Sequence, residues 1–100
     1  MGYFNKEKLK KFTDVKELED VKKSLYLAQS INSNRLNAEL VQLAKMDIDT
    51  FVKLDEKKRE EVLKTPLNLA KYMALQMESE NQLLLTIKDV QERLDELKGK

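Results

Sequence analysis

Apolar residues recur every three or four positions along most of this chain, which is the period of an α-helix with one buried face. The longest such stretch runs from Thr65 to Gly99. Thr65 suits the N-cap, and Pro66 suits the first helical position, where its missing N–H costs nothing. Lys98 and Gly99 suit a C-terminus. We therefore predict one long C-terminal helix over about residues 66–98, closed by a left-handed Gly99.

The predicted long helix has three zones. Apolar residues surround it over residues 67–77, which indicates a central strut enclosed on several sides. Residues 78–82 are polar on every face, and over residues 83–97 the apolar positions narrow to a coiled-coil-like seam spaced alternately four and three apart. We expect this seam to be a partner interface, with a homodimer as one form of it. The predicted interface residues are Leu83, Leu84, Ile87, Val90, Leu94 and Leu97.

Two polar residues, Gln76 and Glu80, interrupt the heptad spacing of the long helix. One hypothesis is a buried polar layer that fixes register between copies of the chain. The other is a segment that faces solvent, which the uniformly polar neighbours favour.

The chain before Thr65 predicts several shorter helices. The first begins at Thr13 or Asp14 and carries an apolar stripe from Val15 to Ile31, about as long as the 83–97 seam. This match predicts antiparallel pairing of the two, within one chain or between two. A turn or kink is expected at residues 32–34, because Asn and Ser side chains compete for backbone hydrogen bonds. Further helices are predicted over about 34–46 and 56–64. Between them we expect a helical turn that is capped by Asp47 or Asp49 and carries Phe51, Val52 and Leu54, and Asp55 is expected to cap the last of these helices.

The composition supports an all-α fold. Two glycines and one proline in 100 residues leave little turn chemistry for β-hairpins, and the chain is rich in helix-forming residues. We predict a small bundle of about four or five helices. Residues 13–98 form its single helical domain, residues 1–12 a basic N-terminal arm, and residues 99–100 a C-terminal tail.

The N-terminal arm holds four lysines against one glutamate, for a local net charge of +3, interleaved with Tyr3, Phe4, Leu9 and Phe12. One interpretation is contact with phosphate or another anionic surface. The favoured one is a short helical turn whose Leu9 and Phe12 tuck under the bundle while the lysines stay solvated.

A degenerate helix-turn-helix over the 34–46 helix and the next one gives the alternative function, that of a small DNA-binding or nucleoprotein-organising protein. The motif fits poorly, because its turn lacks glycine and its second helix opens with Asp47 and Asp49, whose carboxylates repel phosphates. The residues that would contact nucleic acid are Lys6, Lys8, Lys10, Lys11, Lys53, Lys57, Lys58 and Arg59.

Neither catalysis nor a cofactor is expected. The chain has no histidine and no cysteine, so it lacks the usual general base, the thiolate nucleophile and the preferred zinc ligands. Asp47, Asp49 and Asp55 begin like a calcium loop, but Phe51 occupies a ligand position and the obligatory glycine is missing. We expect no metal site and assign these aspartates to helix caps.

Charge and hydropathy restrict the function further. The net charge is +1, which provides no overall attraction to nucleic acid or anionic membrane. No apolar run approaches the roughly 20 residues of a membrane span, and we expect a cytoplasmic protein. These observations predict a non-catalytic protein–protein interaction module that acts through its amphipathic C-terminal helix. A small adaptor, inhibitor or assembly factor, including one encoded by a virus or plasmid, belongs to this class.

Overall fold

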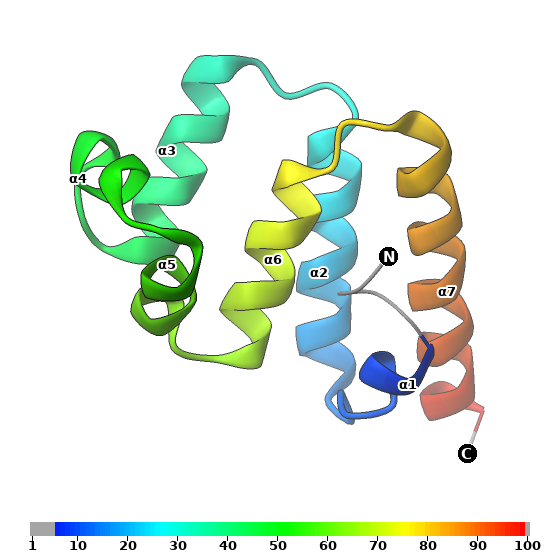
Figure 1. The fold of residues 1–100 in the computed structure, drawn as a ribbon. Coiled ribbons are helices and arrows are strands. Elements are labelled where there is room, and N and C mark those ends of the chain that lie inside the picture. The colour runs from blue at the N-terminus through cyan, green and yellow to red at the C-terminus, as the bar shows by residue number, and fades with distance from the viewer. Residues whose placement is uncertain (1–5, 100) are drawn as a thin grey trace.

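The computed structural model of the protein describes residues 6–99, and this part of the chain is all-helical (Figure 1). It contains seven helices, shorter and more numerous than the predicted four or five. Their bounds are α1 Lys6–Leu9, α2 Val15–Ala28, α3 Ser33–Ala44, α4 Ile48–Lys53, α5 Glu56–Leu63, α6 Pro66–Gln76 and α7 Glu80–Lys98. The all-α class predicted from composition is confirmed.

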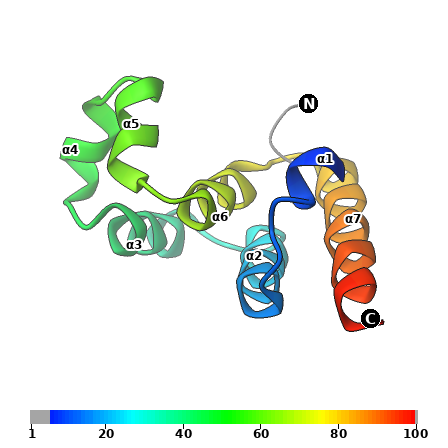
Figure 2. The same cartoon turned by 90° about the horizontal axis from the view of Figure 1, so that it is seen from below.

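Helix α2 lies between α6 and α7, while α1 lies near the ends of α2 and α7 at the opposite end from the α6–α7 connection (Figure 1). Helices α2 and α7 are antiparallel, because Glu19 lies 3.9 Å from Lys98 and Lys22 contacts Gln91. Helices α3 to α5 and helix α7 occupy opposite ends of the molecule, with α6 between them (Figure 2). The predicted pairing of the first helix with the seam therefore occurs within one chain.

Helix α6 divides the buried side chains into two cores. The α2–α7 core consists of Leu9, Leu18, Val21, Leu25, Ala70, Ala74, Leu83, Ile87, Val90 and Leu94. The α3–α5 core consists of Leu40, Ala44, Phe51, Leu63, Tyr72 and Leu75. Ala70 and Ala74 face the first core and Tyr72 and Leu75 the second, so the prediction of a central strut over residues 67–77 is correct.

The prediction of one helix over residues 66–98 is wrong. Helix α6 ends at Gln76 and helix α7 begins at Glu80, with Met77 in an extended conformation (φ −70°, ψ 125°). The physical reason is that α7 turns back to pack on α2 and α1 rather than continuing away from them. Ser79 caps the new helix by accepting a hydrogen bond from the Gln82 N–H at 3.3 Å.

The predicted start at Thr65 and end at Gly99 are correct, but the predicted left-handed conformation of Gly99 is not. The Thr65 hydroxyl accepts the Asn68 N–H at 3.1 Å, as an N-cap should, and Pro66 is the first helical residue. Gly99 follows the last helical residue, yet its φ is −77°, so it is right-handed and the predicted left-handed closure is wrong. Its N–H still donates to the Asp95 carbonyl at 2.8 Å, which continues the helical hydrogen bonding by one residue.

Side-chain caps define the other helix starts. Asp14, Asn32 and Asp55 each accept a backbone N–H from the first turn of the following helix, at 2.8 to 2.9 Å. A break near the predicted turn at residues 32–34 is present, but it falls at residues 29–32, because Asn32 is the cap and Ser33 and Asn34 already belong to α3. The predicted cap at Asp55 is confirmed. Asp47 occupies the N-cap of α4 without a side-chain bond to it.

Two lysines end helices in left-handed conformations that non-glycine residues rarely adopt. Lys45 follows α3 with φ 59°, and Lys64 follows α5 with φ 71°. The Thr65 N–H donates to the Leu63 carbonyl at 2.8 Å across Lys64, so this residue is the centre of a tight γ-turn between α5 and α6.

Candidate functional site

Four of the six predicted interface residues lie inside the chain's own core. Leu83, Ile87, Val90 and Leu94 are at most 9% exposed and pack in the α2–α7 core. Leu97 is partly buried against the same core. Only Leu84 is largely exposed, at 51%. The seam therefore faces α2 of the same chain, and an interface between chains on this helix has to use other residues or a rearranged fold.

The largest exposed apolar side chains near α7 are Leu84 and Leu85 of α7, at 51% and 60%, and Tyr26 of α2, at 50%. Leu84, Lys88 and Gln91 share one helix face because they are spaced four and three apart. Lys22 and Tyr26, four apart on α2, share another.

These two helix faces adjoin. The Lys22 ammonium donates a hydrogen bond to the Gln91 side chain and lies 5.9 Å from the centre of the Tyr26 ring. Tyr26 lies one turn after Lys22 and Leu84 lies two turns before Gln91, so both are displaced toward the same end of the antiparallel pair. We call Tyr26, Leu84, Leu85 and Lys88 the α2–α7 outer surface. Leu85 lies at its far edge, because helical spacing turns it about 100° from Leu84 toward Asp89.

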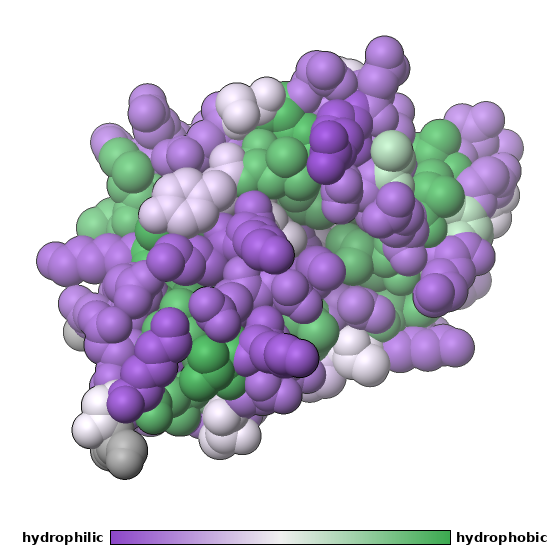
Figure 3. Space-filling model, turned by 180° about the vertical axis from the view of Figure 1, so that it is seen from behind, coloured by the Kyte–Doolittle hydropathy of each residue, from purple (hydrophilic) through white to green (hydrophobic). Residues whose placement is uncertain are grey.

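The face of the molecule seen in Figure 3 carries its apolar side chains in separate patches, with hydrophilic side chains between them. A broken pattern of this kind differs from the continuous apolar surface of an obligate interface. Any partner bound to such a face must therefore combine small apolar contacts with polar ones at their edges.

The lysine-rich α1 segment is docked onto the fold. Leu9 is 2% exposed in the α2–α7 core, and Phe12 packs against that core. Arg93 of α7 fastens the segment by donating from Nε to the Phe12 carbonyl at 3.2 Å and from Nη2 to the Lys10 carbonyl at 3.1 Å. From residue 6 onwards the arm therefore agrees with the favoured interpretation, a short helical turn whose Leu9 and Phe12 pack under the bundle. The rest of the arm, with Tyr3 and Phe4, lies outside the described residues.

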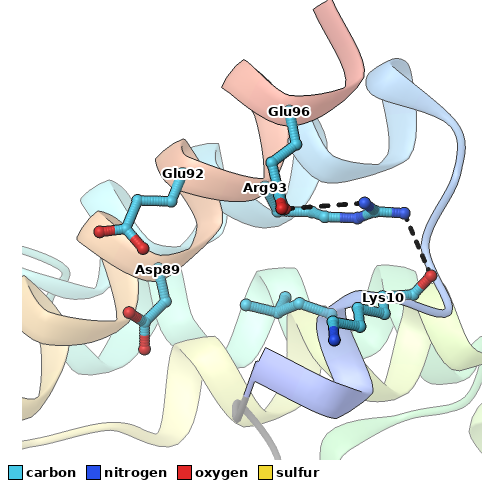
Figure 4. Close-up of a pocket in the computed structure, with 6 residues that line it drawn as sticks. Lys10, Asp89, Glu92, Arg93 and Glu96 are labelled. Carbon is cyan, nitrogen blue, oxygen red and sulfur yellow. Dashed lines mark hydrogen bonds and ion pairs between the residues drawn. The ribbon is translucent and has the colours of Figure 1, made fainter. Parts of the chain in front are cut away.

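Acidic side chains of α7 border a hollow of about 240 Å³ between α1 and α7 (Figure 4). Asp89, Glu92 and Glu96 line it together with Lys10, and Glu96 lies 3.7 Å from the Arg93 guanidinium. A phosphate approaching Lys10 from this side would meet carboxylates. The positive charge that the arm shows in sequence is therefore offset locally in the fold.

The basic residues predicted to touch nucleic acid on α4 and α5 have different environments. Lys53, Lys57 and Lys58 are exposed. Arg59 is directed inward: its Nη2 donates to the Val52 carbonyl at 2.7 Å, and its guanidinium lies 5.8 Å from the centre of the Phe51 ring. We infer that Arg59 joins α5 to α4 and leaves three lysines for any external contact.

The helix-turn-helix hypothesis gains little from the geometry. Its second helix, α4, spans only six residues from Ile48 to Lys53 and has Asp47 as its N-cap residue. Residues 47–64 carry six acidic against five basic side chains. A phosphate backbone along this segment would meet net repulsion rather than attraction.

A second hollow, of about 440 Å³, lies where α3 and α5 end and α6 begins. Both left-handed lysines, Lys45 and Lys64, border it, together with Asn68, whose amide donates to the Leu63 carbonyl at 3.0 Å. No acid–base pair accompanies these lysines in the lining, so the hollow lacks the constellation that proton transfer requires.

Within residues 6–99, no group of three or more acidic residues is placed to hold a metal ion. Over the same described residues, each helix is too short or too polar to cross a bilayer.

The chain matches no protein-family model, no curated protein and no solved structure. The surface chemistry described above is therefore the basis for assigning a function.

Sequence reasoning missed Tyr26, Leu85 and the roles of Arg59 and Arg93. Tyr26 and Leu85 carry a usable signal, because each lies off the apolar stripe of its own helix. Arg59 and Arg93 carry none, because their partners are distant in sequence or are backbone carbonyls. Gln76 and Glu80 are both exposed, as the solvent-facing hypothesis predicted.

Proposed function

We propose that this protein is a non-catalytic protein–protein interaction module that binds its partner through the α2–α7 outer surface. The observation that carries the proposal is the adjacent pair Leu84 and Leu85, each more than half exposed on a helix whose other large apolar residues are buried or partly buried. Two neighbouring exposed leucines gain free energy when a partner covers them, at roughly 25 cal/mol per Å² removed from water.

The surroundings of these leucines indicate the chemistry of the partner. Tyr26 supplies an exposed aromatic ring on the neighbouring helix, and tyrosine is enriched among residues that contribute most to binding. Lys22 and Lys88 supply positive charge beside Tyr26 and Leu84, which favours acidic side chains along that edge of an apolar ridge on the partner. Asp89, four residues after Leu85, supplies negative charge at the far edge. An amphipathic helix with an acidic rim has this pattern, and so does a suitable face of another folded protein.

The proposal keeps the predicted class of adaptor, inhibitor or assembly factor and moves its contact residues. Leu84 is retained from the predicted set, and Leu85 and Tyr26 are added to it. A second copy of this chain is one partner that the surface can accept.

A photo-cross-linking residue at position 84, introduced in cells that make the protein, tests the proposal. We expect one specific adduct, lost when Leu85 is changed to Ser on the same background. Val52 is the matched control, because it is 51% exposed like Leu84 but lies on α4. Equal labelling from positions 84 and 52, or no specific adduct with protein or with a second copy, would rule the surface out.

Nucleic-acid binding remains the alternative, with Lys8, Lys10, Lys11, Lys53, Lys57 and Lys58 as its described exposed basic residues. Light scattering at low and high salt, with and without duplex DNA, separates it from the main proposal. Contacts to phosphate weaken steeply as salt rises, whereas apolar contacts hardly respond. A complex with DNA that dissociates at high salt would favour the alternative.

A further inference from the structure

We propose that α7 can exchange between two copies of the chain, so that α7 of one copy fills the place on α2 and α1 that α7 occupies in the other. The exchange uses the buried face of α7. It is independent of the proposed function, which uses the exposed face of the same helix.

The first argument is the pattern of contacts around α7. The helix packs mainly against α2, and Arg93 joins it to the α1 segment. Its extensive packing is not with α6, the helix that immediately precedes it. Helix α7 can therefore leave while α6 keeps its packing on α2 and on α3 to α5.

The second argument is the short connection between α6 and α7. Met77, Glu78 and Ser79 include no glycine or proline, so each can adopt helical dihedral angles. The heptad spacing continues across them through Gln76 and Glu80, both of which are exposed. Contacts of Met77 and Ser79 hold the connection in its present form: Met77 packs on the α2–α7 core, the Met77 N–H donates to the Ala74 carbonyl at 3.3 Å, and Ser79 caps the Gln82 N–H.

The third argument concerns what a straightened connection would produce. Residues 66–98 as one helix would be about 50 Å long at 1.5 Å per residue, whereas the longest dimension of the molecule is 43 Å. Helix α7 would then project from its own body with an apolar face exposed. The face comprises Leu83, Ile87, Val90 and Leu94. The surface that matches it side chain for side chain is α2 of a second copy.

A reciprocal exchange restores every contact of α7, including Lys22 with Gln91 and Arg93 with the Phe12 carbonyl. The buried area of each core is unchanged. Which form is populated therefore depends on the conformation that residues 77–79 prefer and on the protein concentration. The heptad periodicity that predicts one long helix then describes the exchanged form, and the two-helix arrangement describes the closed one.

Opposite substitutions at the connection test the proposal. Ser79→Ala removes the cap of the closed form and improves the continuous helix, and with two connections per dimer it should raise the association constant roughly 25-fold. Glu80→Pro should favour the closed form and so lower the association constant. Ser79 already has the extended conformation that a following proline requires (φ −76°, ψ 122°), and Thr65 with Pro66 is the same arrangement at the start of α6.

Proline at position 80 would interrupt a continuous helix and should lower the association constant by at least about a thousandfold. Glu80→Ala is the matched control for loss of the carboxylate. The dimer fraction is measured by light scattering after refolding at high protein concentration, with circular dichroism to confirm that each variant is folded.

A cross-link distinguishes exchange from ordinary dimerisation. The chain has no cysteine, so Lys22→Cys and Gln91→Cys can be placed on separate chains and mixed during refolding. A short bis-maleimide should join the two chains only where α7 of one lies on α2 of the other. A Ser79→Ala chain that stays monomeric, a dimer that Glu80→Pro leaves intact, or a dimer without the mixed cross-link would overturn the proposal.

Discussion

The two cores on either side of α6 are built by different means. The α2–α7 core is formed mainly by two long antiparallel helices, and its buried residues are aliphatic. The α3–α5 core is formed by three short helices packed on α6, and it contains the buried aromatic pair Phe51 and Tyr72, whose ring centres are 5.6 Å apart at 85°. The same chain therefore combines a periodic core with one that depends on individual contacts.

The difference shows what short helices need. Helices of six to twelve residues gain little from their own hydrogen bonds, so caps and tertiary contacts must define them. In the α3–α5 core, Asn32 and Asp55 cap two helices, and Arg59 joins α5 to the Val52 carbonyl of α4 and to the Tyr72 hydroxyl of α6. In the α2–α7 core, Arg93 has a comparable role only at the α1 segment.

Charge inside the α2–α7 core should have the largest effect. Ile87→Asp places a carboxylate among aliphatic side chains, and its cost of several kcal/mol is comparable with the whole stability of a domain this size. We expect the variant to be largely unfolded at 25 °C, with low helix content by circular dichroism and no cooperative transition on heating. Leu85→Asp, on the 60% exposed neighbour, should stay folded. A folded Ile87→Asp chain that has only lost self-association would show that the face is not intramolecular core.

Removing the aromatic ring of the other core should have the next largest effect. Phe51→Ala empties a site that is 2% exposed and should destabilise the protein by about 3 to 5 kcal/mol. Hydrogen exchange should then show α3 to α5 losing protection before α2 and α7. Uniform loss across both cores would mean that α6 couples them into a single cooperative unit.

Substitution of Arg59 or Arg93, which join helices through hydrogen bonds to backbone carbonyls, should lower the unfolding free energy less than substitution of the core residues. Arg59→Ala removes a guanidinium bonded to Val52 and stacked on Phe51, and we expect a loss of about 1 to 3 kcal/mol in urea unfolding. Arg59→Lys should recover little, because an ammonium cannot reproduce the planar fork. Arg93→Ala should cost about 1 kcal/mol and expose amides of α1 specifically. Equal losses from both variants would contradict this ranking.

Relief of the left-handed lysines should give the smallest change, and a favourable one. Lys45→Gly removes a β-carbon from a residue with φ 59° and should stabilise the protein by up to about 1 kcal/mol, measured as a rise in the denaturant midpoint. Lys64→Gly should act likewise at φ 71°. Lys57→Gly, inside α5, is the opposite control and should destabilise the protein. A lower midpoint for Lys45→Gly would show that its side chain contributes more than the backbone strain costs.

The sequence predicts the helices best where a capping residue and the start of a helical apolar pattern fall at the same place. Thr65 with Pro66, Asp14 and Asp55 mark real helix starts, and the 15–31 stripe and the 83–97 seam do meet. Ser79 carries the same kind of signal, since Ser followed three residues later by Gln82 is a capping-box pattern. The prediction of one long helix gave more weight to the heptad spacing, which continues past Ser79 although Gln76 and Glu80 are polar.

Other features have no local signal. Lys45 and Lys64 adopt left-handed conformations although lysine has no preference for them, because the turns between packed helices impose these angles. The choice between an interface and a core for Ile87 depends on which helix α7 meets, and periodicity is the same in both cases. The sequence can mark Tyr26 and Leu85 as lying off their apolar stripes, but that they lie on adjoining helices follows only from the placement of α2 beside α7.

The separation of α2 and α7 along the chain also sets an order of events during synthesis. Helix α2 is complete at Ala28, and α7 ends 70 residues later at Lys98. At 5 to 20 residues per second, roughly 4 to 14 s pass between the two. Helix α6 can cover one side of α2 in that time, but the side that receives α7 stays open. Neighbouring nascent chains on one polysome thus expose this face of α2 before either has made the helix that fills it.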